Sequence, residues 1–542
     1  MYNLKGTPLM GERRVDETPA APRNSRDEER AYNRAIRAWS FYDWANHAYI
    51  TTTASTFFPP YFIAIAAPAF ISAGKSAVDP AAASSARDAA SNVFAFTVSG
   101  ALLFAALLSP LLGTYADITG KRKRTLLWTT GLGGILASMM VVVQTGNWPM
   151  GLLLYFLTQI AMNVALGLNS SLLPHVARPD DLDRASSLGY AMGYAGGGLL
   201  LAINAALYFF SPALGITHGL AARFAFLSVG LWWIGFSMPL ALGVGEPEAT
   251  PLKGGGWSPL HDAVTRLGHT LRDIRRYREL FKMLVAYWFY MEGIGAIILL
   301  ATAYGAALGL DTGVLIAMLL MTQFVAFPYA LAYGRIPDHS SKWSGFFLSM
   351  ILWTAATFPL MGAYANTSGS VGIAKGFAWI GLNQAAGLAL SLLIGRRLLQ
   401  PLAAKLDAKR AVILGLCVYS VIPIWGMFLR TPAEFFMLGW MVGSVQGGTQ
   451  ALSRGVYAAM LPKAKSGEFF GIYGLAEKFA GVLGPLLYGL VGTWTGSPRS
   501  SIFSLVLFFI IGIALFARVD VRAGRAEAAQ EEAAIETAHA AD

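Results

Sequence analysis

The chain has 542 residues, of which 55% are hydrophobic and only 13% are charged, and its formal net charge is +10 at pH 7. A soluble domain carries about 25% charged residues, so this composition excludes an ordinary soluble fold and indicates a surface that lipid covers. Many segments of roughly 18 to 25 residues carry almost no charge, which is long enough for a helix to cross the hydrocarbon core of a bilayer. The sequence therefore predicts an all-α polytopic membrane protein whose partner is the lipid bilayer.

The positive charge and the single cysteine bear on the partners and sites that this membrane protein can have. The Lys and Arg residues lie in short loops between apolar segments, so they indicate membrane topology and not a nucleic-acid partner. Cys417 lies inside an apolar run, and one cysteine excludes both an intramolecular disulfide and a cysteine-based metal site. We expect no bound metal.

Taken in order, the first half of the chain predicts an arm, a bundle and a loop. Residues 1–36 are polar and predict a disordered cytoplasmic arm. Residues 37–245 predict an N-terminal six-helix bundle, and residues 246–281 predict a cytoplasmic central loop that contains an amphipathic helix on the membrane surface. The expected spans of this bundle lie at about 40–66, 93–115, 125–145, 149–169, 187–210 and 223–245.

The second half predicts a larger bundle. Residues 282–520 predict a C-terminal bundle that includes an extra helix pair at 345–395, and residues 521–542 predict a cytoplasmic tail. Because Lys and Arg concentrate in alternate loops, we expect about fourteen spans with both termini in the cytoplasm. We expect a multi-pass protein of the plasma membrane, which in a bacterium is the inner membrane. The expected spans lie at about 282–307, 312–334, 345–364, 371–395, 411–429, 434–454, 468–493 and 500–518.

The first polar motif lies where the first span begins. Tyr42, Asp43 and Asn46 belong to the run 37–49, which leads directly into an apolar segment. A carboxylate and an amide at this position can line the cytoplasmic mouth of a transport path, so we assign these three residues to a cytoplasmic gate. The alternative is that Asp43 caps the start of the span and bonds to cytoplasmic loops.

A second motif lies between the second and third spans, where the sequence reads Gly113-Thr-Tyr-Ala-Asp117-Ile-Thr-Gly120-Lys121-Arg122. Its glycines permit a tight turn between two helices. Asp117 can cap the next helix or pair with a cation, so Asp117 and Arg122 join the predicted gate. The alternative is an ordinary basic turn.

Weaker copies of this motif indicate an internal repeat. One copy contains Asp338, which also joins the predicted gate, and a fainter copy at 401–410 follows the extra helix pair. The motif resembles the signature loop of the major facilitator superfamily. The resemblance implies a major facilitator fold of two six-helix bundles, to which this chain adds an inserted helix pair that faces lipid.

The fourth and fifth spans carry weaker signals. Asn163 and Tyr194 are candidates for the lining of a central cavity, although packing explains Tyr194 as well. Gly189, Gly193 and Gly197 recur at four-residue spacing, which predicts close contact with another helix.

Charged residues inside membrane spans cost several kcal/mol unless they are paired or hydrated, so each one is a functional candidate. Glu292, Glu477 and Lys478 fall near the bilayer midplane, where transporters bind substrates and coupling ions. A buried carboxylate can exchange protons near neutral pH, so Glu292 and Glu477 are candidate proton carriers. Tyr290, two residues before Glu292, joins this set. The alternatives are a Glu292 carboxylate that hydroxyls satisfy, and structural ion pairs for the other two charges.

A polar stripe lies on the twelfth span. Gln446, Gln450 and Arg454 are spaced four residues apart, so they share one face of an apolar helix. A guanidinium clamps carboxylates, so the stripe suits a zwitterionic or carboxylate-bearing ligand. The alternative for Arg454 is a cytoplasmic topology anchor.

Three blocks of the chain together resemble one branch of that superfamily, the vacuolar amino-acid effluxers linked to autophagy in fungi and their bacterial relatives. The blocks lie at 39–49 with 57–62, at 169–174 with 189–194, and at 446–454 with 468–471 and 478–479. The resemblance covers nearly all of the chain except the arms and the extra helix pair, which departs from the twelve-span pattern. His47 stands where the family usually has serine. The resemblance implies amino-acid export.

These observations predict a secondary active transporter that moves a small solute by alternating access. No nucleotide-binding domain is recognisable, so we expect that ATP does not drive transport directly. A gradient of the solute, of protons or of another ion must then drive it. We also expect no cofactor and no catalytic activity. We expect a monomer. One alternative is an exporter of drugs or other metabolites, which the Gln/Arg stripe disfavours. An alternative of another class is a non-transporting receptor or a membrane enzyme, but the seven histidines show no metal-ligand spacing.

Overall fold

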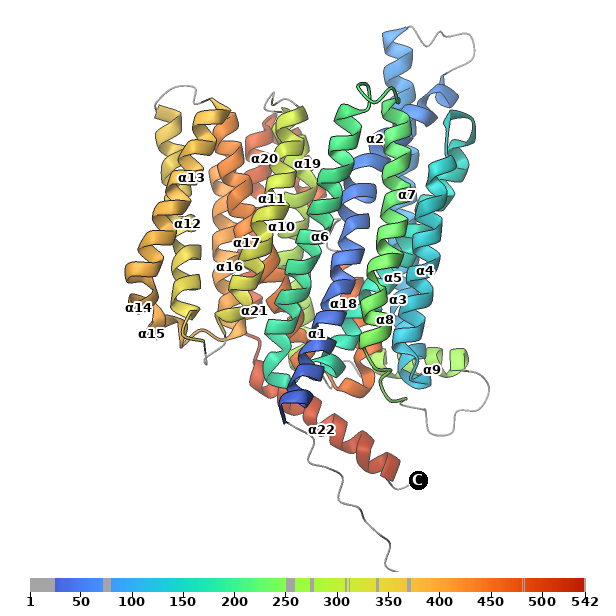
Figure 1. Cartoon of the computed structure of the whole chain (residues 1–542), viewed down its shortest axis with the longest axis vertical. Coiled ribbons are helices and arrows are strands. Elements are labelled where there is room, and N and C mark those ends of the chain that lie inside the picture. Colours follow the sequence, from blue (N-terminus) through green and yellow to red (C-terminus); the bar gives the residue numbers. More distant parts are fainter. Residues whose placement is uncertain are drawn as a thin grey trace, which may run out of the picture.

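The computed structural model describes residues 25–71, 79–249, 259–272, 277–307, 310, 312–337, 341–367, 372–479, 481 and 483–540. These described residues are nearly all helical and contain no strand. Most of the helices run side by side along one direction, so the molecule is a bundle of long, roughly parallel and antiparallel rods (Figure 1). The prediction of an all-α polytopic membrane protein is confirmed.

The first half of the chain begins with a long interrupted helix. Helix α1 (Ser25–Ala48) continues through the π-helical turn η1 (Tyr49–Phe57) into α2 (Phe58–Ala66). Pro59 and Pro60 lack amide hydrogens, so the turns before them cannot close in the regular α pattern. The remaining helices of this half are α3 (Pro80–Thr119), α4 (Arg122–Met139), α5 (Trp148–Val176), α6 (Leu182–Phe210), α7 (His218–Phe236) and α8 (Met238–Gly243).

The second half holds the remaining long helices and several short ones. Pro432 lies in the first turn of α17, where its missing amide hydrogen costs nothing, and Thr431 and Glu434 form a capping box there. The helices are α9 (Pro259–Arg272), α10 (Arg278–Ala307), α11 (Thr312–Arg335), α12 (Ser344–Thr367), α13 (Ile373–Leu390), α14 (Arg396–Leu398), α15 (Gln400–Ala403), α16 (Ala408–Gly426), α17 (Pro432–Ala459), α18 (Ser466–Phe479), α19 (Leu483–Thr495), α20 (Pro498–Ser504), α21 (Val506–Ala517) and α22 (Val521–Ala540).

Eleven helices of the described chain are long and apolar enough to cross a membrane. The other three expected spans are 40–66, 434–454 and 468–493. Their described residues are mostly helical, but none of the three is among the eleven. The last of these is divided between α18 and α19. The count of about fourteen spans, like the proposed domain boundaries, therefore stays a prediction.

The two halves of the chain form two groups of helices that lie next to each other (Figure 1). Helix α6 packs against α1 in its own group and against α11 and α17 of the other group, and α3 packs against α18. The inserted helices α12 and α13 lie at the outer edge of the second group, where they contact α17. Only 28% and 17% of their most apolar windows are buried inside the protein, so most of these windows lie on the outside of the bundle. That this surface faces lipid stays a prediction.

We call one end of the bundle the basic end. It holds α9, α22 and the start of α1 (Figure 1). The basic start of α4 lies there too, because Arg122 of α4 and Arg266 of α9 both donate to the Ala464 backbone oxygen. The amphipathic helix expected within 246–281 is α9. The expected tail is helical too, and Glu531 of α22 bonds to Lys465 at 2.8 Å.

Part of the expected N-terminal arm is ordered as helix. Residues 25–36 belong to α1, whereas residues 1–24 lie outside the described residues. Asp27 and Glu28 lie in the first turn of this helix, where negative charge is favourable. Tyr32 donates to the Asp181 carboxylate at 2.7 Å, so this segment also has a contact with the start of α6. Helix propensity and a tertiary contact order residues 25–36, although their polar composition predicted disorder.

Candidate functional site

One contact between the two groups of helices involves the loop motif after α3. The Asp117 carboxylate accepts hydrogen bonds from the backbone amides of Gly467 and Glu468, both at 3.0 Å. These amides belong to the first turn of α18, where amide hydrogens lack helical partners and the helix dipole favours an anion. The guanidinium of Arg122 donates to Asp117 and also to the backbone oxygen of Ala464, the latter at 3.2 Å. One carboxylate and one guanidinium thus tie the first group to the second.

The same layer is closed by α9 and by close backbone contact. Arg266 of α9 forms an ion pair with Glu468 at 3.3 Å, and both side chains are buried. A Cβ atom on Gly113 would lie 2.1 Å from the backbone oxygen of Gly467, so α3 and α18 touch through their backbones. We call Asp117, Arg122, Arg266 and Glu468 the outer layer.

A second polar contact lies deeper in the bundle and joins α1 to α17. Arg454 donates to the Asp43 carboxylate at 3.1 Å, and the exposed fractions of the two residues are 2% and 0%. The other carboxylate oxygen of Asp43 accepts from the Asn169 amide at 3.0 Å. Arg454 also donates to the Ser186 hydroxyl at 2.9 Å and to the Ser186 backbone oxygen at 3.0 Å. We call Asp43, Asn169, Ser186 and Arg454 the inner layer.

Two aromatic rings enclose the guanidinium of the inner layer. The guanidinium carbon of Arg454 lies 4.4 Å from the centre of the Tyr190 ring and 5.0 Å from that of Trp39. The Trp39 indole donates to the backbone oxygen of Asn169 at 2.9 Å, which fixes the ring. Ring faces stabilise a cation that has lost its water, so the buried Arg454 is compensated by charge, hydrogen bonds and π contacts together.

Glycines of α6 make this approach possible. A Cβ on Gly189 would lie 2.4 Å from an Asp43 carboxylate oxygen, and one on Gly193 would lie 2.5 Å from the His47 ring. A Cβ on Gly197 would lie 3.1 Å from the backbone oxygen of His47. The close helix contact that the glycine spacing predicted is therefore confirmed, and its partner is α1.

Further from the basic end, the contact between the two groups of helices is made by aromatic and amide side chains instead of charged ones. The Tyr194 hydroxyl of α6 donates to the Gln450 amide oxygen of α17 at 3.0 Å. The His47 ring centre lies 5.8 Å from that of Tyr194 and 6.1 Å from that of Tyr190. Since Gln450 is four residues before Arg454, this group lies about 6 Å further along α17. We call His47, Tyr190, Tyr194 and Gln450 the aromatic layer.

The predicted Gln/Arg stripe therefore points toward the first group of helices. Arg454 and Gln450 both reach side chains of α1 or α6. Gln446 is nearly buried one turn further along α17. Tyr290 of α10 donates to Ser453 at 2.7 Å, so it lies beside the inner layer without contacting Arg454 in the bonds that the structure describes.

Glu292 lies elsewhere. Its carboxylate accepts from the backbone amide of Gly484 at 2.8 Å, in the first turn of α19 after the division between α18 and α19. It is fully buried, and the hydrogen bond places its carboxylate at an interrupted helix rather than in the inner layer. The side chains of Glu477 and Lys478 lie outside the described part of the chain, as does Asp338.

The remaining candidates belong to the interior of the first group. Tyr42 shares a 2.8 Å hydrogen bond with Thr130 of α4, and Asn46 is fully buried. Asn163 donates to the backbone oxygen of Gln159 in its own helix at 2.7 Å. These bonds leave Tyr42 and Asn163 apart from the inner layer.

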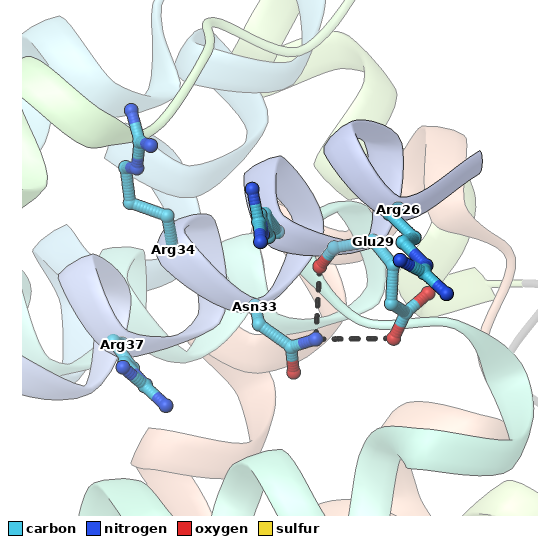
Figure 2. Close-up of a pocket in the computed structure, with 6 residues that line it drawn as sticks. Arg26, Glu29, Asn33, Arg34 and Arg37 are labelled. Atoms are coloured by element: carbon cyan, nitrogen blue, oxygen red, sulfur yellow. Dashed lines mark hydrogen bonds between the residues drawn. The ribbon is translucent and has the colours of Figure 1, made fainter. Parts of the chain in front are cut away.

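A separate pocket lies on the part of α1 that extends beyond the bundle (Figure 2). Figure 2 shows Asn33 bonded to the backbone and side-chain oxygens of Glu29, with arginines on the same helix. The pocket has a volume of about 900 Å³. Its lining comes from α1 alone: Arg26, Glu29, Arg30, Asn33, Arg34 and Arg37. It is therefore a basic face of one helix and not a part of the contact between the two groups.

Sequence reasoning identified Asp43, Arg454, Asp117 and Arg122 but assigned the first two to different sites. It missed Ser186, which contributes through a hydroxyl and a backbone oxygen that no charge pattern marks. The signal available for Asn169 was its amide in an apolar span. For Arg266 and Glu468 the sequence named no partner. It indicated only that each charge needs one if it is buried.

Comparison with known proteins identifies the family of this chain and its fold. The sequence matches the family described as "Vacuole effluxer Atg22 like" over residues 31–393 and 382–529. The uncharacterized MFS-type transporter YxiO of Bacillus subtilis is 26% identical over 497 residues, which cover 90% of this chain and 95% of that protein. Autophagy-related protein 22 of Eremothecium gossypii is 25% identical over 546 residues, which cover 94% of this chain and 95% of that protein.

Solved structures of transporters share the arrangement of helices. The proton:xylose symporter XylE superposes with a TM-score of 0.55 at 12% identity, covering 91% of this chain and 96% of that one. A bacterial homologue of the iron transporter ferroportin, in its outward-facing state, superposes with a TM-score of 0.52 at 12% identity, covering 90% and 98%. These identities establish the fold alone, which is the major facilitator fold. The fold that the signature-loop resemblance implied is confirmed.

Proposed function

We propose a transport function from one premise: the chain belongs to the vacuole effluxer Atg22-like family. It is accordingly an integral multi-pass membrane transporter of the major facilitator type, and its relatives are transporters. Within this class, we propose that it exports a small solute that carries a carboxylate, and specifically an amino acid. Its two bundles would alternate access to a site between them.

The observation that carries this proposal is the buried ion pair between Asp43 and Arg454. It joins helices of different bundles, so the two residues must separate when the basic end opens. Removing one partner of a buried pair costs about 3 to 5 kcal/mol, because a charge is then left without compensation. A solute that replaces Asp43 as the partner of Arg454 removes this cost.

This exchange of partners defines the solute. A carboxylate can accept from Arg454 the hydrogen bond that the Asp43 carboxylate accepts now. A guanidinium can also hold a carboxylate through two parallel hydrogen bonds. The hydroxyl and amide groups of Tyr194, Gln450 and Gln446 lie further along the same path and can bind the rest of a polar solute. An apolar drug would gain no hydrogen bond from these groups, which disfavours the alternative of a drug exporter.

The direction and the driving force are also proposals. The basic loops at the basic end favour a cytoplasmic location for this end and for both termini, in the plasma membrane. The contacts of the outer and inner layers join the two groups of helices at this end, which supports a gate there. Protons are the proposed coupling ion, with Glu292 and Glu477 as candidate carriers, and we propose that the transporter acts as a monomer.

Counterflow in proteoliposomes tests the proposed function. Vesicles are loaded with one unlabelled amino acid, and the uptake of a labelled one is followed for a panel of amino acids. We expect exchange of at least one amino acid by the wild-type protein. We expect Arg454→Gln to reduce this exchange by about tenfold or more, because a charge-assisted hydrogen bond to a carboxylate is worth about 1.5 to 3 kcal/mol.

Arg430→Gln is the matched control, because Arg430 lies just before the same helix and is exposed. It should transport at the wild-type rate. If folded wild-type protein exchanges none of the amino acids but exchanges an uncharged metabolite, the amino-acid proposal is wrong. If Arg454→Gln transports as the wild type does, the site is elsewhere.

A further inference from the structure

The inserted helix pair has a cavity of its own, far from the contact between the bundles. Its volume is about 630 Å³. It lies at the basic end, where α12 begins and where α13 passes through the π-helical turn η7 (Ser391–Gly395) into α14, at the outer edge of the molecule (Figure 1). Its lining includes Ser341, Lys342, Leu392, Leu393, Arg396 and Arg397.

A set of hydrogen bonds holds this cavity in shape. Gln400 accepts from the Gly345 amide at 2.9 Å and donates to the Ser341 backbone oxygen at 3.0 Å. Arg396 donates through its Nε to the Lys342 backbone oxygen at 3.3 Å, and its guanidinium carbon lies 4.2 Å from the centre of the Trp343 ring. Arg396 is therefore held in place at the rim.

Among the described residues, the cavity carries positive charge that no carboxylate pairs with. Lys342, Arg396 and Arg397 all line it, and in the described part of the chain none of the three forms an ion pair with a carboxylate. Arg397 is exposed and Lys342 is exposed, so both charges can turn toward a ligand. Arginine and lysine together at a rigid rim are a phosphate-binding combination.

Beside these cations the surface is apolar and faces lipid. Leu392 and Leu393 are 47% and 72% exposed, and Leu398 is 70% exposed on the next turn. Only 17% of the most apolar window of this helix is buried in the protein. A soluble phosphate would use the cations and leave the leucines unused. A phospholipid uses both, because its phosphate lies at the membrane surface and its acyl chains lie against the helix.

We propose that the inserted helix pair binds an anionic phospholipid. Its headgroup phosphate lies between Lys342, Arg396 and Arg397, and its acyl chains pack on Leu392 and Leu393. The site requires the membrane fold but not the identity of the transported solute. Because α12 and α13 pack against α17, which carries Arg454, the lipid would brace the helix that closes the basic end.

The test uses the full-length protein in detergent and measures lipid binding by native mass spectrometry. Phosphatidylglycerol is compared with phosphatidylcholine of the same acyl chains. We expect the wild type to retain phosphatidylglycerol preferentially. Each cation near a membrane phosphate contributes roughly fivefold in affinity, so Arg397→Gln should weaken phosphatidylglycerol binding about fivefold. The triple variant Lys342→Gln/Arg396→Gln/Arg397→Gln should abolish the preference.

The variant Arg30→Gln/Arg34→Gln/Arg37→Gln is the matched control, because it removes the same charge from α1 at the same end of the molecule. It should keep the preference. If it loses the preference as the triple variant does, the effect is general electrostatics and the site does not exist. If Arg397→Gln binds phosphatidylglycerol as the wild type does, the proposal is also wrong.

Two soluble probes separate a lipid from a free phosphate. Inorganic phosphate and glycerol 3-phosphate at millimolar concentration should not displace phosphatidylglycerol. Displacement by either probe would show a soluble-anion site and would overturn the assignment to lipid. Arg397 is exposed, and it takes part in none of the hydrogen bonds that the structure describes around this cavity. Its single variant therefore remains informative if the triple variant does not fold.

Discussion

At the scale of single residues, Arg454 is the side chain on which the contacts between the bundles converge. Its guanidinium bonds to Asp43 and Ser186 and lies against Trp39 and Tyr190. The sequence marks Arg454 as a charge on an apolar helix, so a partner is required. It does not name Asp43, because the two residues are 411 positions apart and only the packing of α1, α6 and α17 brings them together.

The coupling between these two charges is measurable. We expect Asp43→Asn and Arg454→Gln each to lower the free energy of unfolding by about 3 to 5 kcal/mol, because each leaves a buried charge without its partner. The double variant should lose about 1 to 3 kcal/mol less than the sum of the two single losses. Chemical unfolding in detergent micelles measures all three. Strict additivity would mean that the two side chains do not interact, and Arg430→Gln should stay within about 0.5 kcal/mol of the wild type.

Glu292 was predicted to lie near the bilayer midplane as a binding or coupling residue, and the structure adds one partner, the backbone amide of Gly484. Its carboxylate accepts from the Gly484 amide, so we expect Glu292→Ala to lower the free energy of unfolding by about 1 to 3 kcal/mol. Glu292→Gln keeps an acceptor oxygen and should cost less than half as much. The same unfolding measurement distinguishes them. Equal losses for the two variants would show that the negative charge, and not the acceptor, stabilises the start of α19.

At the scale of elements, α6 organises the contact between the bundles. Its glycines allow α1 to approach on one side, while Tyr194 and Ser186 reach α17 on the other. The glycine spacing predicted the close contact. Hydropathy gave the apolar part of each helix but not its ends: α3 begins at Pro80 and α1 at Ser25, because helices continue beyond the bilayer wherever capping and contacts support them.

Filling one of these glycine positions should separate the two helices. A Cβ at Gly189 would lie 2.4 Å from Asp43 and 2.8 Å from Arg454, so Gly189→Ala must displace the inner layer. We expect a loss of about 1 to 3 kcal/mol in unfolding free energy together with reduced counterflow. Gly131→Ala on α4 is the control, because nothing lies within 4 Å of its Cβ position. Wild-type behaviour of Gly189→Ala would mean that α1 and α6 are less closely packed than described.

At the scale of the whole molecule, the outer and inner layers both join the two groups of helices at the basic end, and the proposed transport cycle requires both to open. Asp117 holds the start of α18 through two amide hydrogens, and Arg122 bridges to the same segment. An anion at a helix start contributes up to about 2 kcal/mol when partly buried, which is enough to change the populations of the closed and open states by more than tenfold.

Labelling of a buried cysteine tests this closure. Ser187 is buried on α6, so a cysteine there, with Cys417→Ser in the background, should react slowly with a membrane-impermeant maleimide. Adding Asp117→Asn should raise the labelling rate about tenfold, because the open state becomes more populated. Lys121→Gln removes an exposed charge from the same loop and should leave the rate unchanged. Equal rates for Asp117→Asn and its parent would show that the outer layer does not hold the end closed.

The sequence by itself determined the membrane class, the helical fold, the family and the loop motif at Asp117, because composition, charge spacing and local motifs are properties of the chain alone. It also determined that Asp43, Glu292 and Arg454 need partners, since a bare charge in lipid is too costly. Only the tertiary structure decided which partners they have. Asp43 meets Arg454 and Glu292 meets Gly484 because helices distant in the chain pack side by side, and that packing depends on side-chain shape at every contact.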